Sequence, residues 1–252
     1  MWQLPLSSIL DNSPWFGLML GNSRRHWAKF VGTTVLKAWD EENTVQLPPL
    51  TDHLPLLIAS VISEQTSYWA TSPQVRVLTL ADVPLKGMYS TLGIDRALAV
   101  FGGGTCYGWP ILVIDAGTAL TFTGADTEQR LVGGAILPGL GLQQSSLAQK
   151  TSALPAIEFS QDLPQRWAKD TSQGIQSGII YTLLAGMLDF IKAWQTEYPQ
   201  SYIVITGGDC NRLHSYFTKL FPDNNAHLVV DPHLIFRGMV ALKTEHGCSQ
   251  TL

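Results

Sequence analysis

The pattern of apolar and polar positions along the chain predicts an α/β protein. An apolar segment at 15–20 ends at a glycine turn, residues 25–31 alternate between polar and apolar positions, and a second turn leads to an apolar segment at 35–39. Alternation with a period of two residues is typical of a half-buried strand. The order is therefore strand, turn, strand, turn, strand.

The same order occurs a second time further along the chain. An apolar run at 111–114 ends in a turn at Gly117, and strands are expected at 120–123 and 130–136. Aligning Gly21 with Gly117 superimposes the two patterns at a spacing that is too long for a solenoid repeat. We interpret this as a duplicated α/β domain whose halves face each other, although any α/β protein offers glycine-ended strands.

Further segments complete the two expected halves, which span 15–100 and 101–252. Buried strands are expected at 54–61, 75–80, 202–206 and 227–230. Asp170 and Thr171 stand where a helix cap belongs, ahead of a long segment with apolar residues at helical spacing. A terminal helix is expected at 234–242.

Composition narrows the class of protein. The chain has 252 residues and a formal net charge of −4, with 45% hydrophobic and 14% charged residues. It is too apolar for a disordered chain, and an acidic balance argues against nucleic acid as a partner. No apolar run approaches the length of a membrane span, and no basic residue precedes Arg24, so neither a transmembrane helix nor a signal peptide is expected. Three widely spaced cysteines indicate free thiols, and we expect a cytoplasmic protein.

Three glycine turns that follow apolar strands are candidates for phosphate binding. Successive backbone N–H groups in such a turn form a concave anion site, and glycine allows close approach. One turn of this kind is weak evidence, but three at strand ends fit a split nucleotide site. Neither a P-loop nor a Gly-x-Gly-x-x-Gly motif that enters a helix occurs. The turns are Gly21-Asn22-Ser23, Asp115-Ala116-Gly117-Thr118 and Gly207-Gly208-Asp209.

A second group of candidates is the segment Gly93-Ile94-Asp95-Arg96, with Tyr89 nearby. An arbitrary Asp-Arg pair is more often a surface ion pair that contributes little. In a chain with few charges, however, a leading glycine would admit a substrate. Arg96 could then bind a substrate carboxylate with two hydrogen bonds, and Asp95 could accept a proton from a substrate hydroxyl.

In type and order, these motifs resemble those of the type III pantothenate kinases, members of the acetate kinase/sugar kinase/Hsp70/actin superfamily. The resemblance covers roughly residues 15–242. It implies an α/β fold with two ribonuclease H-like (actin-like ATPase) halves, a mixed sheet and a nucleotide cleft between the halves. The matching segments are Gly93–Arg96, Asp115–Ala119, Gly133–Leu140, Ala153–Pro155, Asp170–Thr171 and Gly207–Asp209.

The resemblance also implies a function. A type III pantothenate kinase transfers the γ-phosphate of ATP to the primary hydroxyl of pantothenate and forms 4′-phosphopantothenate, the first step of coenzyme A biosynthesis. It implies Mg²⁺ with the nucleotide, a monovalent cation (K⁺ or NH₄⁺) and a homodimer. On the composition given above, no nucleic acid or membrane is expected as a partner.

Roles for single residues follow from the same resemblance. Asp95 is expected to accept the proton of the substrate hydroxyl, and Asp115 to bind the monovalent cation. Thr171 is expected to reach pantothenate across the dimer interface. The other residues expected to bind pantothenate are Tyr89, Gly93, Ile94 and Arg96. Those expected to bind ATP are Gly21, Asn22, Ser23, Gly117, Thr118, Gly207 and Gly208.

One position departs from the family pattern, which opens with Asp-x-Gly-Asn-Thr. Here Met19 stands where the family has the aspartate, and a thioether cannot orient a hydrated Mg²⁺ as a carboxylate does. Asp115 and water could take over, ATP binding could be weak, or activity could be lost. The alternatives are therefore another small-molecule kinase on this fold or a regulatory relative without turnover.

Overall fold

The structure is a computed structural model that describes residues 13–43, 54–62, 66–67, 69–224 and 228–243. The chain divides into two compact units, each built on a five-stranded sheet. Unit 1 consists of Met1–Gly108, Thr127–Leu131 and His233–Leu252, and unit 2 of Trp109–Asp126 and Val132–Pro232.

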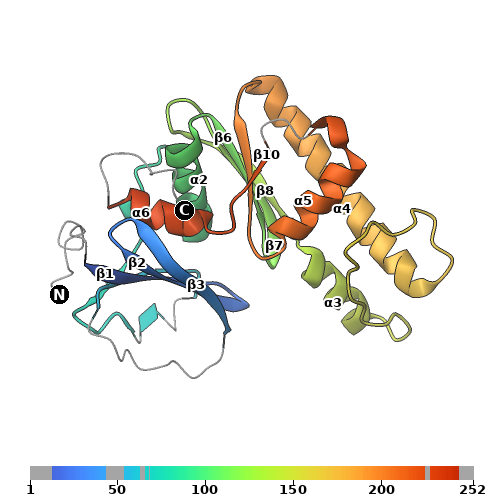
Figure 1. Cartoon of the computed structure of the whole chain (residues 1–252), viewed down its shortest axis with the longest axis horizontal. Helices are drawn as coiled ribbons and strands as arrows, with labels where there is room; N and C mark the ends of the chain where they lie inside the picture. Colours follow the sequence, from blue (N-terminus) through green and yellow to red (C-terminus); the bar gives the residue numbers. More distant parts are fainter. Residues whose placement is uncertain (1–12, 44–53, 63–65, 68, 225–227, 244–252) are drawn as a thin grey trace. The chain divides into compact units, whose positions relative to one another are not determined.

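The sheet of unit 1 has the strand order β3-β2-β1-β4-β5. Its strands β1, β2 and β3 are labelled in Figure 1. Strands β1, β2 and β3 pair in antiparallel fashion, whereas β4 and β5 run parallel to β1. Alternate side chains of β1 and β2 enter a core around Trp69 on one face of the sheet. The strands are β1 (Pro14–Leu20), β2 (Arg24–Val31), β3 (Thr34–Glu42), β4 (Leu56–Ser60) and β5 (Val75–Val77), and a 3₁₀ turn, η2, covers Leu80–Asp82.

Helices α2 (Ile94–Tyr107) and α6 (Leu234–Ala241) pack against each other on the other face of this sheet (Figure 1). They cross where each has a glycine. A Cβ atom on Gly102 would lie 2.5 Å from the backbone nitrogen of Gly238, so only hydrogen allows this approach. Helices α2 and α6 thus contact each other backbone to backbone at this crossing.

Unit 2 repeats the topology of unit 1. Its sheet has the order β10-β9-β6-β7-β8, so β6 corresponds to β1, β7 to β2, β8 to β3, β9 to β4 and β10 to β5. The directions agree as well, because β6 is antiparallel to β7 and parallel to β9. This confirms the duplication inferred from the glycine turns. The strands are β6 (Ile111–Ala116), β7 (Ala119–Ala125), β8 (Leu131–Pro138), β9 (Tyr202–Thr206) and β10 (Leu228–Val230).

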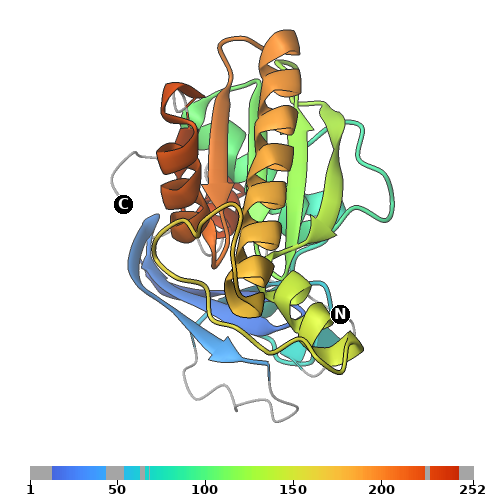
Figure 2. The same cartoon turned by 90° about the vertical axis from the view of Figure 1, so that its right-hand side faces the viewer.

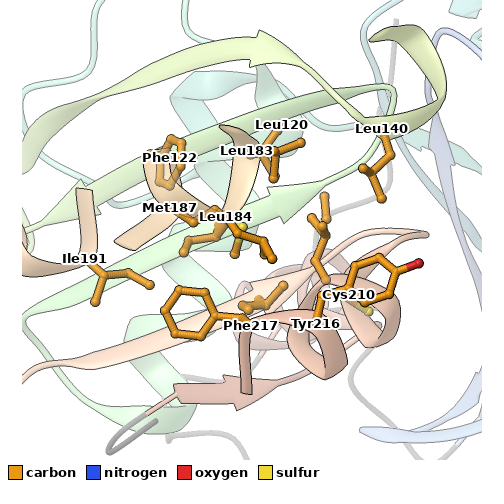
Figure 3. Close-up of a cluster of buried hydrophobic side chains, with 14 of the residues drawn as sticks. Leu120, Phe122, Leu140, Leu183, Leu184, Met187, Ile191, Cys210, Tyr216 and Phe217 are labelled. Carbon is orange, nitrogen blue, oxygen red and sulfur yellow. The ribbon is translucent and has the colours of Figure 1, made fainter. Parts of the chain in front are cut away.

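Helix α4 (Thr171–Glu197) lies along the sheet of unit 2 and forms the core with α5 (Cys210–Leu220) (Figure 2). Side chains of α4 and α5 point at one another and at β7, and Phe122 and Met187 lie among them (Figure 3). Asp170 caps α4, since its carboxylate accepts a hydrogen bond from the Gln173 N–H at 2.9 Å. Unit 2 also contains α3 (Leu140–Lys150) and a 3₁₀ turn, η3 (Pro222–Asn224).

Helix α4 is also long and apolar enough to cross a membrane by length and composition, with a mean hydropathy of 1.4 over its best window. The expectation from the sequence that no segment could do so is thereby corrected. A core helix passes the same test, and 44% of that window is buried. The buried side belongs to the core of unit 2.

The predicted strands agree with the structure to within a few residues, as do the helix capped at Asp170 and the terminal helix. Helices α2, α3 and α5 were not predicted, and the expected division at 100/101 would cut α2. The compact units instead keep α2 whole and add α6 to unit 1. Of the three cysteines, Cys106 and Cys210 carry free thiols, and Cys248 lies outside the described residues.

We predict that Gly102→Ala lowers the free energy of unfolding by about 1–3 kcal/mol, the usual cost of overpacking. The new methyl group would meet the backbone of α6, which outweighs the gain of about 1 kcal/mol in helix propensity. Urea denaturation followed by circular dichroism measures the change. Gly141→Ala in α3 is the control, because a Cβ there meets nothing within 4 Å. Equal losses in both variants would contradict the close crossing.

Candidate functional site

The carboxylate of Asp95 is held at the start of helix α2. Gly93 is the N-cap residue, and an oxygen of Asp95 accepts a hydrogen bond from the Arg96 N–H at 2.8 Å. Burial raises the pKa of Asp95 above its ordinary value; the Arg96 N–H and the guanidinium charge act in the opposite direction without cancelling the effect of burial. Asp95 is therefore a more basic carboxylate than one on the surface, as a proton acceptor requires.

Gly93 makes room for this carboxylate. A Cβ atom at Gly93 would collide with the Asp95 oxygen, while the backbone of Gly93 has ordinary extended angles. The prediction from the sequence was that glycine stands at position 93 so that a substrate can approach closely. The structure corrects that reason, because the space beside the glycine is taken by Asp95 itself.

Arg96 and Tyr89 lie together beside Asp95. The Arg96 side chain is only 7% exposed, and its Nη1 donates a hydrogen bond to the Tyr89 hydroxyl at 3.0 Å. Tyr89 is 45% exposed, so the buried guanidinium of Arg96 is hydrogen-bonded to a side chain that reaches the surface. Ile94 is buried, which leaves its backbone but not its side chain to contact a ligand. The structure thus brings together the expected residues of this segment.

The first glycine turn joins β1 to β2. The Gly21 N–H donates to the carbonyl oxygen of Arg24 at 3.0 Å, so this donor serves the hairpin itself. Asn22 and Ser23 are exposed at the tip of the turn. Asn43, which follows β3, fixes the turn through its side-chain amide, which donates to the Gly21 carbonyl oxygen at 3.0 Å. Sequence reasoning missed Asn43, because nothing local links it to a turn so far upstream.

In unit 2 the second and third glycine turns meet at Asp115. Leu112, Ile114 and Ala116 of β6 enter the core, so alternation directs Asp115 to the opposite face of the sheet. A Cβ on Gly207, whose φ is +88°, would collide with the Asp115 carboxylate and lie 2.6 Å from the carbonyl carbon of Ala116. The strand end at β9 therefore closes directly onto the strand end at β6.

Hydrogen bonds fix the same turns. The Asp209 N–H donates to the Ala116 carbonyl oxygen at 2.9 Å, and the Gly139 N–H, at the start of α3, donates to the Thr118 carbonyl oxygen at 2.9 Å. A Cβ on Gly139 would collide with the Gly117 carbonyl oxygen. Gly139 was part of a matching motif but was not expected at the site. Three segments of unit 2 thus converge around Asp115.

The contacts described above do not explain two further expected residues. Gly208 has open space where its Cβ would be, so nothing in its surroundings requires glycine. Thr171 is the first residue of α4 and is exposed. Its role toward a substrate stays a prediction.

The donor atoms of the site fit a phosphate-bound, hydrated cation better than a cation held by protein alone. Among the described residues, no group of three or more His, Cys, Asp or Glu side chains could hold a metal ion. Mg²⁺ usually keeps several waters and takes one or two carboxylates together with substrate phosphates. Asp115, set between glycine turns, is a single carboxylate and would need further donors from a ligand or water to hold a cation.

Similarity to known proteins shows the family to which this chain belongs. The type III pantothenate kinase family model matches residues 18–193. A type III pantothenate kinase from Nostoc sp. is 47% identical, over 89% of this chain and 92% of that protein, and one from Synechocystis sp. is 46% identical over 94% of each. The chain belongs to the type III pantothenate kinase family.

Solved structures agree on the fold of this pantothenate kinase family member. A conserved Baf family protein from Campylobacter jejuni has a TM-score of 0.65 at 20% identity and covers 90% of this chain and 96% of its own. The activator of 2-hydroxyisocaproyl-CoA dehydratase from Clostridium difficile has a TM-score of 0.51 at 11% identity, over 91% and 93%. Together with the duplicated mixed sheets, these likenesses confirm the actin-like ATPase fold class.

We predict that Gly207→Ala destabilises the protein by about 1–3 kcal/mol, because the backbone is strained for a residue with a Cβ and the methyl group meets the backbone of Ala116. Differential scanning calorimetry measures the shift in melting temperature. The neighbouring Gly208→Ala serves as a matched control and should change little. If the two variants melt alike, the close approach of β9 to Asp115 is wrong.

Proposed function

We propose that this protein is an ATP-dependent pantothenate kinase, which phosphorylates the primary hydroxyl of pantothenate and forms 4′-phosphopantothenate for coenzyme A biosynthesis. Membership of the type III pantothenate kinase family supports the activity. The structural observation that supports this activity is the arrangement of Asp95 and Arg96, at the start of α2, with Tyr89, which is hydrogen-bonded to Arg96. A substrate with both a carboxylate and a hydroxyl suits this pair of side chains. The buried guanidinium of Arg96 can bind the carboxylate, and the Asp95 carboxylate, whose pKa is raised, can accept the proton of the hydroxyl.

In this mechanism Asp95 orients the substrate hydroxyl and receives its proton. The pKa of a primary alcohol lies far above that of a carboxylic acid, so Asp95 cannot remove the proton beforehand. Phosphoryl transfer proceeds through a loose transition state in which alignment and charge stabilisation dominate. Asp95 therefore accepts the proton late, as the bond to phosphorus forms. Arg96 holds the pantothenate carboxylate, and the Tyr89 hydroxyl fixes the guanidinium.

The glycine turns supply the binding of ATP. Gly21, Asn22 and Ser23 in unit 1, and Gly117, Thr118, Gly207 and Gly208 in unit 2, are the residues proposed for it. Mg²⁺ bound to the nucleotide would neutralise charge on the phosphates. Asp115 is the carboxylate proposed for a cation, and the monovalent ion, K⁺ or NH₄⁺, is assigned to it. That the turns at Gly21 and Gly117 bind one triphosphate remains a prediction from the sequence.

A homodimer in the cytoplasm is part of the proposal, with Thr171 reaching the partner's pantothenate. Exposed apolar side chains on one face of β8 support an interface in unit 2, because Val132 is 47% and Ile136 64% exposed. Both side chains point to the same face of an edge strand, which we propose as part of the interface. No nucleic acid or membrane partner is proposed.

We predict that the purified protein releases ADP from ATP when pantothenate is present, faster with K⁺ than with Na⁺. A coupled ADP-release assay with and without pantothenate measures this. Release with another alcohol as acceptor would indicate a different small-molecule kinase. No release with any acceptor would indicate a regulatory relative, and the proposed activity would then be wrong.

We predict that Asp95→Asn lowers kcat by roughly 10²–10⁴-fold, the typical contribution of a general acid–base residue, while both ligands still bind. Because the Asp95 pKa is raised, the native state loses stability as pH rises from 3.8 toward the folded pKa, and the neutral amide avoids that cost. The variant should therefore melt at or above the wild-type temperature at pH 7.

Steady-state kinetics, calorimetric titration of each ligand and thermal melting test this combination. The acid limb of the wild-type kcat/KM profile should lie above pH 3.8 and should vanish in the variant. Asp223→Asn, at an exposed carboxylate in η3, is the control. Undiminished turnover in Asp95→Asn would remove Asp95 from the mechanism.

A further inference from the structure

The duplication makes position 19 of unit 1 the counterpart of position 115 in unit 2. Each residue stands two positions before the first glycine of its hairpin turn, on the central strand of its sheet. Met19 pairs with Ala59 of β4 in the same way as Asp115 pairs with Thr206 of β9. Unit 2 thus has a carboxylate where unit 1 has a thioether.

A different pair of polar side chains lies beside Met19. His26 on β2 is directly opposite Met19, and Asp40 on β3 is directly opposite His26. Residues opposite one another in antiparallel strands point to the same face, so the three side chains form one row across the sheet. The row belongs to the face on which alternate residues of β1, such as Gly17, contact α6.

The geometry fixes the proton on the imidazole of His26. Its Nδ1 lies 2.8 Å from a carboxylate oxygen of Asp40, which can only accept, so Nδ1 carries the hydrogen. In the neutral ring Nε2 is then an acceptor, and it lies 3.9 Å from the position of a Cβ on Gly21. Within the described residues, Asp40 is the only hydrogen-bonding partner of this ring.

We infer that His26, oriented by Asp40, replaces the missing carboxylate of position 19 and accepts a hydrogen bond from water bound to the divalent cation of MgATP. This inference rests on the proposed ATP-dependent function. A carboxylate oxygen and a neutral imidazole nitrogen are both acceptors for metal-bound water, whereas the sulfur of Met19 is a weak one. Mg²⁺ keeps most of its waters in proteins, so contact through water is its ordinary mode.

The Asp40 carboxylate does for His26 what a supporting carboxylate does for a metal-binding histidine. It fixes the tautomer and the ring orientation, so that the other nitrogen is left as the acceptor. Asp40 also lies 3.8 Å from the guanidinium of Arg24. His26 is thus a positioning residue for the nucleotide's cation, and the pair is more than a surface ion pair.

Calorimetric titration with ATP, in the presence of Mg²⁺ and again with EDTA, tests the inference. His26→Ala should weaken binding of MgATP about 10- to 100-fold, the usual effect of losing a residue that supports a metal. Binding of metal-free ATP should not change. His26→Gln, which keeps an acceptor, should recover part of the loss. His214→Ala, at a partly exposed histidine of α5 in unit 2, is the matched control.

A second pair of variants gives the sharper result. Met19→Asp should restore MgATP affinity in the His26→Ala background and change it little in the wild type, because residues that share one role are not additive. Mn²⁺ added with ATP and followed by electron paramagnetic resonance reports cation binding without turnover. Circular dichroism checks that each variant is folded.

The outcomes separate this inference from the proposed function. If the wild type binds no ATP with or without Mg²⁺, both fail. If the wild type binds MgATP and His26→Ala binds it equally well, only the role of His26 fails. The role also fails if Met19→Asp has the same effect in both backgrounds, or if His26→Ala weakens metal-free ATP as much as MgATP.

Discussion

The cost of keeping the Asp95 carboxylate partly out of water is the constraint on which the site in unit 1 depends. Burial disfavours the ionised form, and one backbone N–H and the neighbouring guanidinium only partly compensate. Stability alone would select a neutral residue at this position. A fold that instead removes the Cβ at Gly93 to accommodate the carboxylate retains a group that chemistry requires.

Glycines whose Cβ position is occupied by neighbouring atoms also occur in unit 2, around Asp115. The Cβ position of Gly207 is occupied by the Asp115 carboxylate and the end of strand β6, and that of Gly139 by the turn at Gly117. In each case the glycine is explained by a side chain or backbone that occupies the place of its Cβ. Only Gly207, with φ of +88°, also needs the conformational freedom of glycine.

Duplication gave both units one topology, but the units have diverged in what the topology holds. The central strand carries Asp115 in unit 2 and Met19 in unit 1, and a histidine and an aspartate from adjacent strands stand next to Met19. In an antiparallel sheet, the residue directly opposite on the next strand can take over the role of a lost side chain, since both side chains point to the same face. Such a shift is invisible when single positions are compared.

The sequence by itself determined the strands, the duplication and the family, because period-two alternation and glycine turns are local and repeat in order. It also placed Asp95 and Arg96 at one site, since they are adjacent in the chain. It missed α2, whose apolar run and consecutive glycines obscure the helical period, as well as α3 and α5, and it could not join α6 to unit 1. Asn43 at the Gly21 turn, Gly139 at Gly117 and Asp40 on His26 were decided by tertiary structure alone, because pairing between strands and helices brings distant residues together in a register that no local pattern encodes.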